Sequence, residues 1–392
     1  MDLDLSTLWE HLADAGTDGY LFDTDDFDAN QYYLTGFTAP DGVTSLHTSD
    51  GSHLLTNALE YGRATNESRT DSVAVSADYD ARELRQEYGE HEGRNRVLKR
   101  FLEDHEISRA SVPGDFPLVT ADGLRELGVE LEPTIEDVIE DLRAVKTDEE
   151  IESLRDVQAA NQSAMATVER VLRESTVEDG TLHYEGEVLT SERVKVELET
   201  TLLGERCGLD EAIVACGSDG AEPHNRGSGP IKAGKPIVVD IFPWSKSTRY
   251  YGDMTRTFVK GEPGEKAREW YDLTHEAFEA AMDAVKEGVT GEAVHGAACD
   301  VFEDAGLSTL RTDPTAETGF IHSTGHGVGL EIHEQPGLNE HAEEPLQAGH
   351  VITVEPGLYD PDVGGIRIED MVVVTEDGYD NLTDYPIEFV VE

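Results

Sequence analysis

Short runs rich in hydrophobic residues, separated by polar turns, occupy the first third of the chain. Four of these runs have the length and the polar turn boundaries of β-strands: 19–24, 30–37, 52–57 and 72–76. Apolar residues at helical spacing predict a helix over 94–105, and the pattern becomes extended again over 110–117. This mixture of elements predicts a small α/β domain over residues 1–140.

The hydrophobic period becomes that of an α-helix over 136–173. This pattern breaks at 146–148, where Thr147 and Glu150 have the spacing of a capping box that starts a new helix. Three further segments also have helical spacing: 191–208, 264–287 and 291–305. Because the rest of the chain is rich in strands, we predict an α+β second domain over 147–392.

Two predicted strands of the second domain each carry an acidic residue, Asp240 and Asp253. The connection between them is short enough for an antiparallel hairpin, which would bring the two carboxylates together. A carboxylate in such an apolar setting is costly to bury without a partner. For Asp253 the alternative is an ion pair with Arg249 or Arg256, and for Asp240 it is a helix cap or a rare buried acid.

Glycine residues surround His326, at Gly325, Gly327 and Gly329. Their missing side chains would let the backbone and a metal ion approach closely. His333 follows after a strand-like pattern over its four preceding residues. The alternative is a glycine-rich turn with two histidines on the surface.

Further ionisable residues follow toward the C-terminus. Glu355 ends a β-branched run and precedes a Pro-Gly turn. Arg367 and Glu369 lie two apart on a predicted strand and therefore on one face, where the guanidinium could orient the carboxylate or simply pair with it. Asp370 is expected on the opposite face and is not predicted to be a ligand. His224 lies in a polar loop, where a lone histidine is usually solvated.

Five of these residues together have the chemistry of a metal centre: Asp240, Asp253, His326, Glu355 and Glu369. Four carboxylates and one imidazole suit a pair of divalent cations that hold an activated water. From the residues alone, the prediction is a hydrolase with two metal ions.

Composition excludes several partners. The chain carries 83 acidic and 30 basic residues, a net charge of -53, which repels nucleic acid and anionic membranes. Such a surface suits a cytoplasm rich in salt, and we hypothesise a halophilic source. Three cysteines are too few for a disulfide framework. Neither a signal peptide nor an apolar run long enough to span a bilayer is apparent, so we predict a cytoplasmic protein.

The order of the five candidate ligands, with the stretches YGDMTRTF, GHGVGLEIHE, VEPGLY and GIRIED, resembles the pita-bread metallopeptidases over 147–392. That family includes methionine aminopeptidase, Xaa-Pro aminopeptidase and Xaa-Pro dipeptidase (prolidase), with the metal-free creatinase. The stretches YYLTGF and LRAVKTDEEIESLR resemble the creatinase-type N-terminal domain of its proline-specific members. Methionine aminopeptidases generally lack that domain.

The resemblance implies a role for each candidate ligand. Asp240 would bind one metal ion, Asp253 and Glu369 would bridge both, and His326 and Glu355 would hold the second. Manganese or cobalt is expected, although zinc or iron would satisfy the same ligands. A hydroxide that bridges the metals would attack the peptide carbonyl, with Glu355 as the proton shuttle.

Other residues match positions of the family that contact or support the substrate. His224 and His333 would touch the peptide and stabilise the tetrahedral intermediate, while Tyr359 and Arg367 would support the site. A homodimer is expected because relatives are often dimers.

Two functions share this chemistry, and the resemblance favours an Xaa-Pro aminopeptidase over an Xaa-Pro dipeptidase. Gly337 stands where some dipeptide-specific relatives carry an arginine that can hold the dipeptide's carboxylate. Pro243 and Trp244 replace a glycine-containing segment, from which we expect only a longer loop. A creatinase-like C–N hydrolase and a non-catalytic binding protein are disfavoured, because all five ligands and both substrate histidines are present.

Overall fold

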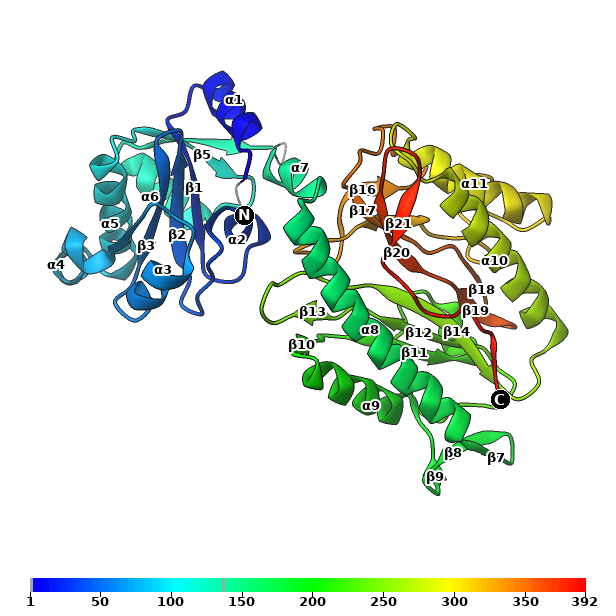
Figure 1. Ribbon diagram of the computed structural model, residues 1–392. Coiled ribbons are helices and arrows are strands. Elements are labelled where there is room, and N and C mark those ends of the chain that lie inside the picture. Colours follow the sequence, from blue (N-terminus) through cyan, green and yellow to red (C-terminus); the bar gives the residue numbers. More distant parts are fainter. Residues whose placement is uncertain (1–2, 136–137) are drawn as a thin grey trace. The chain divides into compact units, whose positions relative to one another are not determined.

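Two compact units make up the chain, Met1–Arg143 and Ala144–Glu392 (Figure 1). The computed structural model describes residues 3–135 and 138–392. The predicted domain limits, 140 and 147, lie on either side of this division.

A mixed six-stranded sheet forms the centre of the first unit, in the order β4-β3-β2-β1-β5-β6. Its strands are β1 Gly19–Thr24, β2 Val43–Thr48, β3 Gly51–Thr56, β4 Ser72–Val75, β5 Arg109–Pro113 and β6 Glu130–Thr134. Its helices are α1 Ser6–Ala15, α2 Ala29–Thr35, α3 Tyr61–Glu67, α4 Ala81–Tyr88, α5 Glu90–Asp104 and α6 Leu118–Glu126. Side chains from α4, α5 and α6 pack with those of the sheet into one apolar core.

One predicted strand of this unit is wrong. The segment 30–37 forms most of helix α2. Asp28 caps its first turn by accepting a hydrogen bond from the Gln31 amide, and Gly36 ends it in the left-handed conformation, at φ 65°. A short apolar run cannot by itself distinguish strand from helix, and these two end residues decide the outcome.

The second unit contains two main sheets, ordered β11-β12-β14-β22 and β16-β15-β17-β20-β21. The strands of the first are β11 Ala212–Cys216, β12 Ile237–Ile241, β14 Met254–Lys260 and β22 Val390–Val391. Those of the second are β15 Gly325–Gly327, β16 Glu334–Leu338, β17 Val351–Val354, β20 Asp370–Val374 and β21 Tyr379–Asn381. Smaller pairings involve β7 Thr176–Glu178, β8 Thr181–Tyr184, β9 Glu187–Val188, β10 Cys207–Gly208, β13 Trp244–Ser245, β18 Gly357–Asp360 and β19 Gly364–Arg367.

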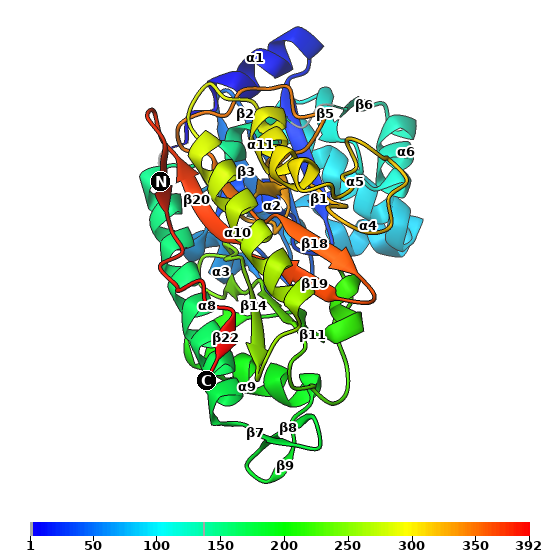
Figure 2. The same cartoon turned by 90° about the vertical axis from the view of Figure 1, so that its right-hand side faces the viewer.

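Each main sheet of this unit has its own pair of helices. Helices α8 Asp148–Glu174 and α9 Ser191–Gly204 share a core with β11, β12 and β14. Helices α10 Glu265–Ala284 and α11 Gly291–Asp304 share another with β17 and β20, and Figure 2 shows α10 running along β18 and β19. The short helix α7, Val138–Ala144, precedes α8.

The predicted start of α8 is confirmed. The Thr147 hydroxyl accepts a hydrogen bond from the Glu150 amide, and the Glu150 carboxylate accepts one from the Thr147 amide at 2.8 Å. The predicted helix over 191–208 is too long, however. The helix ends at Gly204. Cys207 and Gly208 form strand β10, which pairs with β13, a short strand in the connection between β12 and β14.

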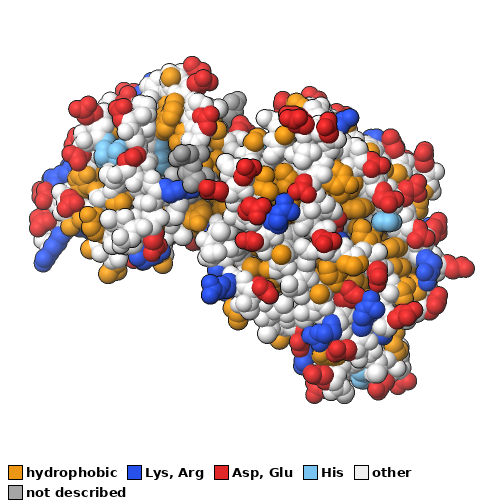
Figure 3. Space-filling model, in the orientation of Figure 1, with side chains coloured by type: hydrophobic (Ala, Val, Ile, Leu, Met, Phe, Trp, Pro, Cys, Tyr) orange, Lys and Arg blue, Asp and Glu red, His pale blue; other side chains and the backbone are white. Residues whose placement is uncertain are grey.

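Acidic side chains are spread over the face of the molecule shown in Figure 3, on both units. Across 3–135 and 138–392, no helix has the length and apolar character needed to cross a membrane.

Candidate metal centre

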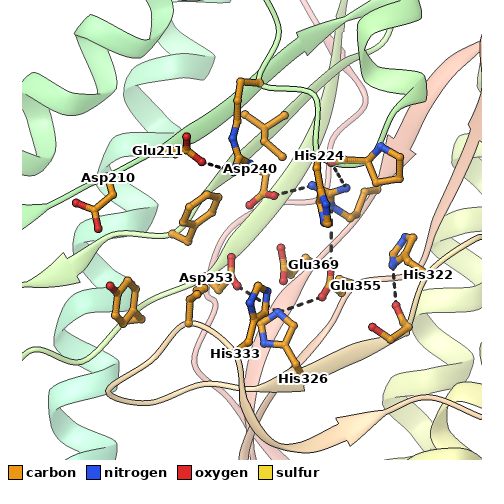
Figure 4. A pocket seen from close by; sticks show the side chains of 18 residues that line it. Asp210, Glu211, His224, Asp240, Asp253, His322, His326, His333, Glu355 and Glu369 are labelled. Atoms are coloured by element: carbon orange, nitrogen blue, oxygen red, sulfur yellow. Dashed lines mark hydrogen bonds and ion pairs between the residues drawn. The ribbon is translucent and has the colours of Figure 1, made fainter. Parts of the chain in front are cut away.

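A cavity of about 630 Å³ in the second unit collects the predicted site residues (Figure 4). Its lining includes every predicted ligand, both histidines predicted to contact the substrate and the predicted supporting arginine: His224, Asp240, Asp253, His326, His333, Glu355, Arg367 and Glu369. The fold therefore brings these eight side chains to one cavity, although they span almost 150 residues of the chain.

The predicted hairpin between β12 and β14 is confirmed, and it brings Asp240 and Asp253 together. The two strands are antiparallel, with Asp240 opposite Thr255. Asp253 lies one residue before β14, and Gln158 on α8 brackets its backbone. The Gln158 amide nitrogen donates to the Asp253 carbonyl at 2.7 Å, while its oxygen accepts from the Asp253 N–H at 3.0 Å. Asn161, one turn later, donates to the Ile241 carbonyl at 2.6 Å.

His326 lies on the short strand β15, and the glycines around it are required by close packing. A Cβ atom at Gly325 would lie 2.0 Å from the Thr353 carbonyl oxygen, and one at Gly327 would lie 2.2 Å from the Gln335 carbonyl oxygen. The strand pairs with β16 on one side and β17 on the other. The imidazole is thereby aimed at the carboxylates from a backbone with little freedom to move.

The strand-like pattern predicted between Gly329 and His333 is wrong, because these residues form a bend between β15 and β16. Glu334 explains the difference. Its carboxylate folds back to accept a hydrogen bond from the Glu331 amide at 3.0 Å, which closes the bend. His333 still lines the cavity, and its ring lies 4.4 Å from the ring of His326, edge to face.

Arg367 and Glu369 do not share one strand as predicted. Arg367 ends β19, whereas Glu369 lies between β19 and β20. Both still line the cavity. Arg367 orients Asp240, to whose Oδ2 it donates at 2.6 Å, while Glu369 Oε2 accepts from the Thr255 hydroxyl at 2.7 Å.

Asp370 lies outside the cavity, as predicted. It accepts from Arg256 at 2.8 Å and from Asn381 at 2.7 Å. Arg256, one of the two alternative partners suggested for Asp253, therefore pairs with Asp370 instead.

The carboxylates of the candidate ligands lie close to one another, and few fixed positive charges lie near them. Asp253, His326 and Glu369 offer ligand atoms that all lie within 4.8 Å of one another. His326 Nε2 lies 3.3 Å from Glu355 Oε1 and 3.7 Å from Asp253 Oδ2. Among the described residues, Asp240 Oδ1 is buried without a hydrogen-bond partner.

The electrostatics show the same deficit of positive charge. Burial and the neighbouring carboxylates raise the pKa of Asp253 and of Glu369 well above their usual ranges. Burial also acts to raise the pKa of Glu355, but the hydrogen bond and charge of His326 outweigh it and bring that pKa to about 2. Carboxylate and imidazole donors in this arrangement fit divalent cations, which would supply the missing positive charge.

Tyr359 and His322 extend the site away from the candidate ligands. The Tyr359 hydroxyl accepts from Arg367 at 2.8 Å and lies 3.0 Å from His322 Nε2. His322 Nδ1 lies 2.7 Å from the Ser323 carbonyl, so Nδ1 donates and Nε2 accepts from Tyr359. Burial lowers the pKa of His322 to about 4, which keeps the ring neutral.

Sequence reasoning missed His322 as a site residue. It lines the cavity and lies four positions before His326, in the same glycine-rich stretch. Its place in that stretch was a usable signal.

The remaining cavity wall is largely apolar, with one charged margin. Ile213, Phe242, Tyr251 and Ile332 supply the apolar surface. The margin contains Asp210, together with Glu211 and Arg226, which form an ion pair.

Family models match both parts of the chain. The model of metallopeptidase family M24 matches residues 152–376, and the creatinase/prolidase N-terminal domain model matches residues 5–157. The chain is 32% identical to the Xaa-Pro dipeptidase of Pyrococcus furiosus over 361 residues, which cover 90% of each protein.

Solved structures agree over nearly the whole chain. The prolidase from Pyrococcus horikoshii superimposes with a TM-score of 0.79 at 26% identity, covering 98% of this chain and 99% of that one. The X-Pro aminopeptidase from Thermotoga maritima superimposes with a TM-score of 0.77 at 27% identity, covering 96% and 98%. The predicted fold class, an α/β N-terminal domain followed by a pita-bread α+β catalytic domain, is confirmed. The chain belongs to metallopeptidase family M24.

Proposed function

We propose that this chain is a metal-dependent Xaa-Pro dipeptidase that cleaves the bond before proline in a dipeptide. This reverses the preference drawn from Gly337, because the similar curated proteins include Xaa-Pro dipeptidases that match along 90% of their length. The observation that carries the chemistry is the buried group of carboxylates without enough positive charge, beside two accessible histidines.

In this proposal Asp240, Asp253, His326, Glu355 and Glu369 would hold two divalent cations. Bound cations supply Lewis-acid activation of a water molecule at neutral pH. Manganese or cobalt is the proposed metal.

The chain's own residues perform the remaining steps. The Glu355 carboxylate lines the cavity beside His326, where it could accept the proton that the attacking water loses. His224 and His333 lie on the cavity wall, where they can hydrogen-bond the peptide and the oxyanion that develops on its carbonyl. Arg367 keeps Asp240 in place through the 2.6 Å hydrogen bond. The apolar wall formed by Ile213, Phe242 and Ile332 suits a proline ring.

An Xaa-Pro aminopeptidase is the second candidate, and two observations favour it. Gly337 places no cation for a dipeptide's carboxylate, and the X-Pro aminopeptidase from Thermotoga maritima is similar along 98% of its length. The two functions share every residue named above and differ only in the peptide length that the site accepts.

A comparison of Ala-Pro with Ala-Pro-Ala tests the proposal. The protein is stripped of metal, and manganese, cobalt or zinc is added back in concentrated salt. We expect metal-dependent cleavage of Ala-Pro and little of the tripeptide. Cleavage of the tripeptide alone would support the aminopeptidase, and cleavage of neither would overturn both.

We also propose that the protein acts as a homodimer in the cytoplasm. Its molar mass by light scattering, against 43.0 kDa for one chain, tests the subunit number.

A further inference from the structure

A fully buried ion pair lies behind the cavity wall, outside the candidate metal centre. Lys146 Nζ lies 3.0 Å from Glu334 Oε2, and each side chain is only 1% exposed. Lysine and glutamate are rarely buried to this extent unless they are paired. Removing one partner of such a pair leaves an uncompensated charge, which is much more costly than removing both.

Glu334 uses its second oxygen to shape the bend that carries His333. Oε1 accepts the Glu331 amide hydrogen at 3.0 Å. The carboxylate packs so closely over Gly329 that a Cβ atom there would lie 2.3 Å from Oε2. The carboxylate therefore fills the inside of the bend over 329–333, and the residue just before it is His333.

Lys146 is held from outside the bend. Its backbone N–H donates to the Gly349 carbonyl at 2.9 Å, and its neighbour Val145 forms an isolated bridge with His350. The next residue, Thr147, caps α8. The backbone of Lys146 is thus fixed on two sides: it is hydrogen-bonded to the segment just before β17, and it lies directly before the capped start of α8.

We propose that Lys146 is a positioning residue for His333 and that it acts through Glu334. The inference rests on the proposed function, because it assumes that His333 contacts the peptide. The Lys146 ammonium holds the Glu334 carboxylate in place, and the carboxylate holds the bend over 329–333. The bend in turn sets where the exposed imidazole of His333 lies beside His326. Neither member of the pair lines the cavity.

The experiment compares Lys146→Met with the double variant Lys146→Met/Glu334→Gln. The single variant leaves the Glu334 carboxylate buried without its cation, so the bend should loosen. In the double variant that charge is gone, and the glutamine oxygen can still accept the Glu331 amide hydrogen. Arg94→Met is the control, because it breaks an ion pair with the buried Asp23 in the first unit.

Two measurements are made on each full-length variant. Hydrogen exchange measures how fast the Glu331 amide and its neighbours exchange with solvent. Steady-state kinetics on Ala-Pro with added manganese gives kcat and KM separately. In Lys146→Met we expect faster exchange over 329–333 and a fall in kcat on the order of 100-fold, as for a displacement of roughly 1 Å. The double variant should recover most of the lost rate, and Arg94→Met should lose stability while keeping its kcat.

Two results would overturn the proposal. One is a Lys146→Met variant that exchanges like the parent over 329–333, and the other is one that loses stability but keeps the parent kcat. If the parent cleaves neither Ala-Pro nor Ala-Pro-Ala, the proposed function fails, and with it the role assigned to His333. Hydrogen exchange still decides separately whether the pair holds the bend.

Discussion

Each unit of the chain buries carboxylates, and the two units differ in how many hydrogen-bond donors and positive charges surround them. In the first unit Asp23 on β1 is 3% exposed and fully satisfied. Arg94 donates to both of its oxygens at 2.7 Å, and the hydroxyls of Thr44 and Thr120 donate at 2.7 and 3.2 Å. This carboxylate has one guanidinium to itself and no need of a further cation.

The second unit gathers the four carboxylates of the candidate ligands around one cavity, and Arg367 is the one lysine or arginine among the described lining residues that pairs with any of these four. The pKa values of Asp253 and Glu369 rise because burial disfavours the charged form and because like charges crowd together there. Burial of an acid is therefore no sign of function by itself. The number of hydrogen-bond donors and cations around it separates a structural carboxylate, such as Asp23, from a candidate ligand.

The largest difference should appear when one acid from each group is neutralised. Glu355→Ala removes both the proposed proton acceptor and a candidate ligand, so kcat should fall by on the order of 10³-fold or more. The matched change Asp23→Asn should cost about 1–3 kcal/mol of stability and leave kcat unchanged. Steady-state kinetics on Ala-Pro and urea unfolding measure the two effects. A Glu355→Ala enzyme with a near-normal rate would remove the role assigned to that residue.

Metal removal should affect the stability of the second unit selectively. A cation at about 1,000 times its Kd stabilises the folded state by about 4 kcal/mol. In a domain of this size that corresponds to roughly 10 °C in Tm, which a chelator should abolish. Calorimetry should show the transition of the first unit unmoved, since Asp23 is already satisfied. Equal shifts in both transitions would contradict the comparison.

Gln158→Leu should weaken the site without touching a candidate ligand. The variant loses both hydrogen bonds to the backbone of Asp253, so we expect about tenfold weaker cation binding, as is typical when a supporting group is lost. Isothermal titration with manganese measures the affinity. Ser163→Ala, on an exposed part of the same helix, is the control and should bind like the parent.

The last prediction concerns the first unit and acid pH. Burial lowers the pKa of His47 to about 3, whereas an unfolded histidine titrates near 6.5. Below pH 6.5 the unfolded chain takes up a proton that the folded one refuses, so this contribution to stability is lost as pH falls, by about 1.4 kcal/mol per unit. Between pH 7 and 5, the free energy of unfolding of the first unit, measured with urea, should fall less steeply in His47→Gln than in the parent. An identical slope would exclude His47 as a source of acid sensitivity.

The sequence predicted most of the site because its signals are local. Glycines flank His326, β-branched residues precede Glu355, and a short connection joins the strands of Asp240 and Asp253. These patterns need no knowledge of distant contacts. The capping box at Thr147 is local in the same way.

The error at the bend before His333 has a tertiary cause, unlike the error over 30–37. The bend before His333 depends on the Glu334 carboxylate and on Lys146, which is 188 positions away. The partners of Asp23 are also far along the chain, 71 positions in the case of Arg94. No sequence pattern reveals how many donors surround a buried acid, so the contrast between the two units becomes visible only in the folded structure.

The hydrogen bonds around the cavity have a consequence for how fast the chain folds and unfolds. Thr255 and Glu369 are 114 positions apart, and Arg367 and Asp240 are 127. Contacts of such long range require the closure of large loops, and they form after local helices and hairpins. We therefore expect the candidate cation site to form late, after the folding transition state. Bound manganese should slow unfolding of the second unit and leave its refolding rate nearly unchanged.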